Sequence, residues 1–335
     1  MKKSFFRGAC VLLAALLTLP LASCGEMKPI KSKGDELKVV MTVDGRDVCY
    51  EELRYVTLNA RRDMEYKYGK DCFTDTSMNV DCTAELESFV RESLMKNAVI
   101  MSYAKELGID VDGKDVKKAV QSTVDSMAEQ AGGKEGYEKQ LEENFLTDHL
   151  LRYNLQASQV LNLLQIKLLE NGTIDGSNEA VRAALESEDF IRTLHVYVQN
   201  DEGEDVESNR QKAQTALDEL NAGEKITSVI GRYSEDFYMT TTDGYYFTYG
   251  EYDQAYEDAA FALDVGEHSG IVETSTGFFI ICRLEKDSEY MNKNFEALKD
   301  QYLYAAANAI LTQRAQNAKI VETDFGKSLV LTEID

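Results

Sequence analysis

The hydrophobic pattern of this 335-residue chain changes twice, and these two changes limit its possible folds more than any other feature. From residue 84 to about residue 170, apolar residues recur every three or four positions, which is typical of amphipathic helices. From Phe190 onward they alternate or form short runs, which predicts strands with short helices between them. Helical spacing returns from Asn294 to Lys319. We therefore expect an α+β fold, with one helical domain interrupted by an inserted α/β domain.

The last predicted helix supports this division of the chain. Its apolar stripe cannot be buried by one helix alone, so we expect it to return to the first helical region. The chain has two prolines and no tryptophan, and so few helix breakers make long helices easy to accommodate.

The N-terminal segment predicts the compartment. Three basic residues, Lys2, Lys3 and Arg7, precede an almost unbroken apolar run from Ala9 to Ala22, as in a secretory signal peptide. The run ends in Leu21-Ala22-Ser23-Cys24, which resembles a bacterial lipobox and implies lipidation of Cys24. We expect a signal peptide over 1–23, a lipidated tether over 24–36, and a location on the extracytoplasmic face of the cell membrane. The alternative is an ordinary signal peptide with a chance cysteine.

The net charge and the cysteine content exclude some classes of partner and cofactor. Lys and Arg number 36 against 59 Asp and Glu, a formal net charge of −23, which lacks the basic footprint that nucleic-acid binding requires. Cys72 and Cys82 flank a polar, turn-rich stretch, and whether they form a disulfide stays open. No cysteine and histidine spacing suggests a metal site, and no cofactor is expected. His149 has no acidic partner at matching spacing, so we expect a surface or packing residue.

The α/β segment carries runs in the order found in one known family. They include Leu194-His195-Val196-Tyr197-Val198, Tyr233-Ser234-Glu235-Asp236, Tyr256-Glu257-Asp258-Ala259-Ala260-Phe261-Ala262-Leu263, Gly266-Glu267-His268-Ser269 and Gly277-Phe278-Phe279-Ile280-Ile281. This segment resembles a parvulin-type (PpiC) peptidyl-prolyl isomerase domain. The flanking helical segments behind a lipobox resemble the extracytoplasmic foldase lipoproteins of the PrsA type, and residues 43–55 look like the start of their SurA-like chaperone domain.

The resemblance implies domain boundaries. We expect a helical, SurA-like chaperone domain whose N-terminal part covers 37–189 and a parvulin-like α/β domain over 190–287. A C-terminal helix within 288–335 would return to the chaperone domain.

The resemblance also implies site residues. His195 matches the first of two histidines that form a hydrogen-bonded pair in the family, and Asp236 matches an acidic position near them. The strand period is consistent with a special role for His195, because Leu194, Val196 and Val198 share one face while His195 occupies the other. The implied substrate-binding residues are mainly aromatic: Tyr246, Tyr252, Tyr256, Phe261, Thr276 and Phe279.

Two departures from the family pattern weigh against catalysis. Phe279 stands where the family has its second histidine, and a phenyl ring cannot hydrogen-bond to His195. The family's glycine-rich turn is here Asp243-Gly244-Tyr245-Tyr246-Phe247, which has lost two glycines. The dense tyrosines from 245 to 256 have two open interpretations: a groove for an extended peptide, or alternating strand residues of which half are core.

These expectations lead to two functions of different class. The first is a membrane-anchored foldase that binds unfolded or proline-containing secreted polypeptides and catalyses peptidyl-prolyl isomerisation. The second is a non-catalytic holdase or scaffold lipoprotein in which the parvulin fold survives as a binding module. A two-lobed solute receptor is disfavoured, because the chain lacks repeated βα units.

Overall fold

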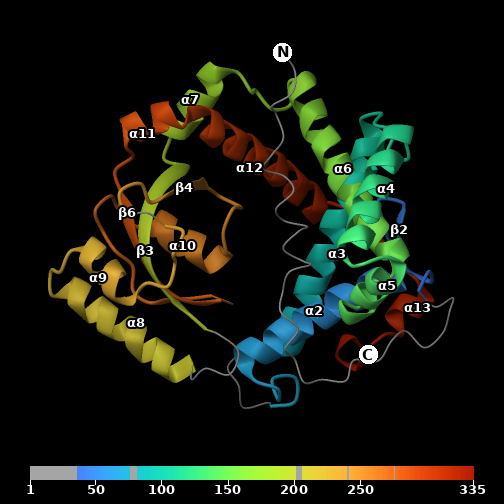
Figure 1. Ribbon diagram of the computed structural model, residues 1–335, viewed down its shortest axis with the longest axis horizontal. Helices are drawn as coiled ribbons and strands as arrows, with labels where there is room; N and C mark the ends of the chain where they lie inside the picture. The colour runs from blue at the N-terminus through green and yellow to red at the C-terminus, as the bar shows by residue number, and fades with distance from the viewer. Residues whose placement is uncertain (1–35, 76–80, 201–205, 240, 275) are drawn as a thin grey trace. The chain divides into compact units, whose positions relative to one another are not determined.

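The structure is a computed structural model that describes residues 36–75, 81–200, 206–239, 241–274 and 276–335. It divides into two compact units, one formed by the residues up to Thr173 together with Ile310–Asp335, and one formed by Ile174–Ala309. Figure 1 shows the elements of both units.

The first unit is mainly helical. Its elements before Thr173 are β1 (Val39–Val43), β2 (Arg46–Cys49), α2 (Tyr50–Tyr68), α3 (Cys82–Glu106), α4 (Lys114–Gln130), α5 (Lys134–Glu143) and α6 (Asp148–Glu170). Its C-terminal part holds the end of α12 (Phe295–Gln316), β7 (Ile320–Glu322), α13 (Asp324–Lys327) and a 3-10 turn (Leu331–Glu333). The helical spacing predicted from residue 84 corresponds to α3, where Leu86, Val90 and Leu94 are buried.

A three-stranded antiparallel sheet joins the two ends of this unit in the order β2-β1-β7. Asp44 and Gly45 both have positive φ, at 49° and 78°, as a two-residue hairpin between β1 and β2 requires. β7 pairs with β1 through Thr42 and Val321, so the C-terminal segment completes a sheet that the N-terminal segment begins.

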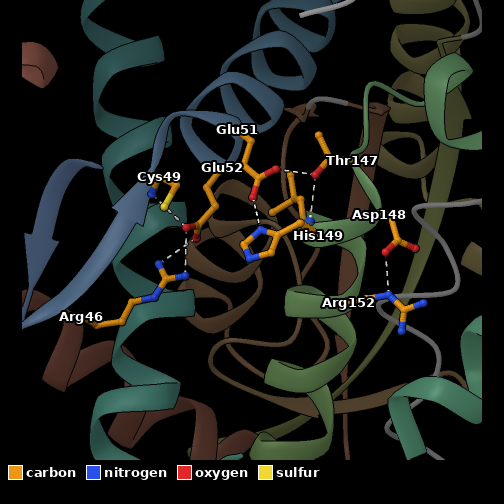
Figure 2. A network of polar contacts seen from close by, with 9 residues as sticks. Arg46, Cys49, Glu51, Glu52, Thr147, Asp148, His149 and Arg152 are labelled. Carbon is orange, nitrogen blue, oxygen red and sulfur yellow. Dashed lines mark hydrogen bonds and ion pairs between the residues drawn. The ribbon is translucent and has the colours of Figure 1, made fainter. Parts of the chain in front are cut away.

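Two buried acidic residues begin α2 and connect it to its neighbours (Figure 2). Glu52 accepts two hydrogen bonds from Arg46, at 2.7 Å and 2.9 Å, and one from the backbone N–H of Cys49 at 3.0 Å. The Glu51 side chain is 2% exposed and contacts Thr147 and His149 at the start of α6. His149 is a surface residue, with 64% of its side chain exposed, and its partner Glu51 lies 98 positions away.

The second unit contains a four-stranded antiparallel sheet in the order β4-β3-β6-β5. Its elements are α7 (Asn178–Glu186), β3 (Phe190–Gln199), α8 (Val206–Asn221), α9 (Ile226–Tyr233), β4 (Tyr245–Thr248), α10 (Gln254–Ala262), β5 (Val272–Glu273), β6 (Gly277–Leu284), α11 (Ser288–Lys293) and the first part of α12.

Different helices pack on the two faces of the central strand β3 (Figure 1). Leu194, Val196 and Val198 pack on one face with residues of α8 and α9, as the alternation in the sequence predicts. The opposite face packs against α10 through Tyr256 and Ala260. The period of two therefore directs His195 toward α10.

The second unit begins upstream of the boundary that the sequence predicts at 190. The Lys286 ammonium donates to the backbone oxygens of Leu185, Ser187 and Phe190, at 3.1 Å, 2.6 Å and 3.0 Å, and so connects the end of α7 to the end of β6. Two of these carbonyls precede residue 190 and the third belongs to it, which explains why α7 groups with this sheet. The second unit continues to residue 309 within α12, whereas the predicted parvulin-like domain ends at residue 287.

Candidate functional site

His195 is buried at 3% exposure and makes a polar contact through each ring nitrogen. Its Nε2 lies 3.1 Å from Oδ2 of Asp236, and its Nδ1 lies 3.0 Å from the hydroxyl of Tyr256. The pair expected from the sequence, His195 with Asp236, is therefore brought together from β3 and the loop after α9. The contact between His195 and Tyr256 differs from the sequence-based expectation, which places Tyr256 among the substrate-binding residues.

Asp236 holds the loop beside this histidine. Its Oδ2 also accepts a hydrogen bond from the Tyr245 hydroxyl at 2.9 Å, while its Oδ1 accepts from the backbone N–H of Tyr238 at 2.9 Å and of Met239 at 3.3 Å. The hydrogen bond from His195, with those from Tyr238 and Tyr245, outweighs burial and lowers the pKa of Asp236 to about 2. Asp236 is thus a carboxylate at neutral pH.

Aromatic rings surround the His195 imidazole on several sides. The Tyr245 ring stacks on it at a centroid distance of 5.5 Å, and the rings of Tyr256 and Phe279 meet it edge-on at 5.6 Å and 5.0 Å. Tyr252 stacks on Tyr256 at 5.1 Å. We call Tyr245, Tyr252, Tyr256 and Phe279 the aromatic cluster.

Side chains near this cluster differ greatly in exposure. Tyr256 is 2% exposed, whereas Tyr252 is 37% exposed, and Phe279 and Tyr245 are half-buried. The loop that Asp236 holds presents Phe237 and Tyr238, which are 90% and 92% exposed. These two residues are not among those predicted from the sequence, and their position directly after Asp236 is the signal that could have indicated them.

A buried carboxylate fixes the turn that leads into α10. Glu257, 2% exposed, accepts hydrogen bonds from the backbone N–H groups of Gly250, Glu251 and Tyr252, at 3.0 Å, 2.8 Å and 2.8 Å. These bonds set the position of Tyr252 relative to Tyr256. Burial raises the pKa of the neighbouring Glu251 to about 7.

Three predicted substrate-binding residues lie apart from His195 or on the margin of the cluster. Tyr246 alternates with Tyr245 along β4, so it points to the opposite face, where it stacks on Tyr290 at 4.8 Å. Phe261 stacks on Tyr249 at 3.7 Å. Thr276 is exposed, and its backbone oxygen accepts a hydrogen bond from Tyr197.

This chain keeps Gly244 in a turn where it lacks two glycines of the family pattern, and the backbone at this position requires a glycine. Its φ is +69°, and a Cβ there would lie 2.4 Å from the backbone oxygen of Thr193. Only glycine fits this turn without moving β3.

The structure also bears on the predictions about a metal site, a disulfide and a membrane anchor. Within the described ranges, no group of three or more His, Cys, Asp or Glu side chains is arranged to hold a metal ion. Cys72 and Cys82 are buried and are not disulfide-bonded in this structure. Among the residues that the structure describes, no helix has both the length and the apolar character needed to cross a membrane. Cys24 lies outside the described residues.

Two family models match the chain, and each matches part of one unit. The PPIC-type PPIASE domain matches residues 176–287, and the SurA-like N-terminal domain matches residues 3–165. The chain therefore combines a SurA-like N-terminal domain with a parvulin domain of the PPIC type, in a mixed α+β fold. This confirms the fold class and the resemblance stated above.

The chain is also similar to PrsA foldases. Foldase protein PrsA from Staphylococcus aureus (strain bovine RF122 / ET3-1) is 26% identical over 222 residues, which cover 64% of this chain and 63% of that protein. The match therefore spans less than two thirds of that relative's length. The PrsA foldases are homologues of this chain.

Solved structures also match. Foldase protein PrsA from Streptococcus pneumoniae is 20% identical, covers 77% of this chain and 91% of its own, and has a TM-score of 0.35. The parvulin of Nitrosopumilus maritimus is 29% identical, covers 29% of this chain and 97% of its own, and has a TM-score of 0.24.

Proposed function

We propose that this protein is a membrane-anchored, extracytoplasmic foldase. In this proposal the SurA-like domain holds unfolded secreted chains, and the parvulin domain binds their proline-containing segments and catalyses peptidyl-prolyl isomerisation. The observation that carries the proposal is the contact of the buried His195 with the part-buried Asp236 against the aromatic cluster, inside a domain of the PPIC type.

Peptidyl-prolyl isomerisation requires few chemical groups from the site. Rotation about a peptide bond crosses a barrier of roughly 18–20 kcal/mol, and uncatalysed X–Pro isomerisation takes tens to hundreds of seconds. No covalent intermediate is needed, only an environment that favours the twisted amide over the planar forms. Aromatic rings suit the apolar proline ring.

The residues of this site differ in exposure, and we assign them different roles on that basis. Tyr252 and Phe279 offer ring surface to a client, and so do the exposed Phe237 and Tyr238 on the loop that Asp236 holds. His195 and Asp236 lie beneath and hold these rings and this loop in place. In this arrangement they support the contact surface rather than contact the client amide.

We expect His195→Ala to lower kcat/KM for a proline-containing peptide at least tenfold, because the rings and the Asp236 loop lose their common support. A protease-coupled assay on residues 25–335 measures this rate. His268→Ala is the matched control, since His268 lies in the same unit and its Nδ1 is 2.9 Å from the backbone oxygen of Ser269.

The second candidate function is a holdase without isomerase activity, and Phe279 favours it because a phenyl ring offers His195 no hydrogen bond. If the wild-type fragment shows no rate above background but suppresses aggregation of an unfolded client, the holdase function stands and the isomerase proposal fails. If it does neither, both fail.

The lipid anchor is a separate part of the proposal, supported by the lipobox-like run that ends at Cys24. We expect the wild-type protein in the membrane fraction with a diacylglycerol-modified N-terminal peptide, and Cys24→Ala in the soluble extracytoplasmic fraction or as uncleaved precursor. Mass spectrometry of the N-terminal peptide checks this. An unmodified Cys24 in the mature protein would exclude the anchor without affecting the isomerase proposal.

A further inference from the structure

The Tyr256 hydroxyl is buried between two polar groups of β3. It lies 3.0 Å from Nδ1 of His195 and 3.0 Å from Oγ1 of Thr193. Tyr256 is 2% exposed and Thr193 is fully buried, so solvent does not compete for these contacts. A buried hydroxyl of this kind needs partners, and both are on the same strand.

The direction of each hydrogen bond follows from the donors and acceptors present. The Asp236 carboxylate only accepts, so Nε2 of His195 must carry the proton in the 3.1 Å contact between them. In a neutral imidazole, Nδ1 is then an acceptor, and the Tyr256 hydroxyl donates to it. Tyr256 has one hydroxyl proton, so Thr193 donates to the Tyr256 oxygen. The chain of donors runs from Thr193 through Tyr256 and His195 to Asp236.

Phe279 cannot take part in this chain. Its ring meets the His195 ring edge-on, with the centroids 5.0 Å apart and the planes at 90°. It therefore restricts the space available to the imidazole but offers no donor or acceptor. Tyr256 approaches the same imidazole with its ring at 87°, and its hydroxyl supplies the hydrogen bond that Phe279 lacks.

We propose that Tyr256 is a positioning residue of this site: its hydroxyl donates to Nδ1 of His195 and so holds the imidazole in the orientation from which Nε2 donates to Asp236. This inference rests on the proposed isomerase function, but it makes a statement about His195 that holds whether or not the isomerase rate is measurable. It also gives Tyr256 a different role from the substrate contact that the sequence implied.

The first test observes the wild-type tautomer directly. Imidazole nitrogen NMR of the ¹⁵N-labelled chain, with the His195 signals assigned by their absence in His195→Ala, is expected to show Nε2 protonated and Nδ1 as a hydrogen-bonded acceptor. A wild-type spectrum with the proton on Nδ1 would overturn the proposal without any variant being made.

The second test removes the hydroxyl alone. In Tyr256→Phe we expect the proton to stay on Nε2, because the Asp236 carboxylate still accepts it, while the Nδ1 signal shifts to that of an imidazole nitrogen without a hydrogen bond. We also expect a fall in kcat of about tenfold, the rate equivalent of about one hydrogen bond, with KM nearly unchanged. Tyr233→Phe is the matched control, because it also loses a tyrosine hydrogen bond, to Glu219, but lies outside the aromatic cluster. A Tyr256→Phe spectrum identical to wild type would overturn the proposal.

The third test is a rescue. Because Phe279 already faces the His195 ring, the double variant Tyr256→Phe/Phe279→His places a hydrogen-bonding ring against the same imidazole. We expect it to restore the signal of a hydrogen-bonded Nδ1 and most of the lost kcat. Restored activity with an Nδ1 that still lacks a hydrogen bond would overturn the positioning role. If wild type shows no isomerase rate, the Nδ1 signals still decide this inference, while the isomerase proposal fails on its own.

Discussion

Glu257→Ala is expected to lower the free energy of unfolding of the parvulin-like unit by about 4 kcal/mol. The carboxylate accepts three backbone N–H groups, from Gly250, Glu251 and Tyr252, at 2.8–3.0 Å. Hydrogen bonds to charged groups contribute about 1.5–3 kcal/mol each and are not additive, and the variant leaves three part-buried donors without this acceptor. Because the turn positions Tyr252, we also expect weaker client binding.

The measurement is denaturant unfolding of the full chain, with hydrogen exchange over 245–263 to localise the loss. Glu257→Gln should fall between wild type and the alanine variant, at about 2 kcal/mol, because the amide keeps one oxygen acceptor. Asp258→Asn is the matched control: its neighbouring carboxyl is exposed and accepts a hydrogen bond from Gln254, so a change within about 0.5 kcal/mol is expected. An alanine variant as stable as this control would show that the three bonds do not stabilise the turn.

Strand periodicity explains which parts of the site could be predicted from the sequence. In β3 the apolar residues occur at every second position, so the face of His195 follows directly. In β4, Tyr245, Tyr246 and Phe247 are all aromatic, and a period of two cannot show which face of such a run meets His195. The resemblance implies Tyr246 at this place, whereas the structure places Tyr245 there.

Contacts between distant parts of the chain could not be predicted in the same way. The three residues of β7 form a strand only because β1 pairs with them, and Val321 and Glu322 are exposed. The Tyr256 hydroxyl reaches His195 across 61 positions, and Glu51 reaches His149 across 98. A single sequence carries no local pattern for such pairs, because their spacing is set by the packing of whole elements.

The contact of Glu51 with α6 leads to the second large prediction. Thr147 is the N-cap of α6, where its hydroxyl accepts from the backbone N–H of Leu150 at 2.9 Å and donates to Glu51 (Figure 2). The Thr147 hydroxyl therefore makes two hydrogen bonds: it accepts one from the first turn of α6 and donates one to a carboxylate with 2% exposure. Within the described part of the chain, Glu51 also contacts the side chain of His149, which is largely exposed and charged only when protonated.

We expect Thr147→Val to lower the free energy of unfolding of the helical unit by about 3 kcal/mol. Loss of an N-cap costs about 1 kcal/mol, and loss of a donor to a buried carboxylate costs about 1.5–3 kcal/mol. Valine has nearly the same shape as threonine, so the change isolates the hydroxyl from packing.

Denaturant unfolding with hydrogen exchange over 147–160 measures the loss, and Thr147→Ser is the matched control because serine keeps both hydrogen bonds. The pair Thr147→Val and Glu51→Gln then separates the two roles of the hydroxyl. If the carboxylate contact dominates, Thr147→Val should cost less in the Glu51→Gln background than in wild type, because a neutral amide needs the donor less than a buried charge does. Equal costs in both backgrounds would mean that Thr147 acts only as a helix cap and that Glu51 does not depend on it.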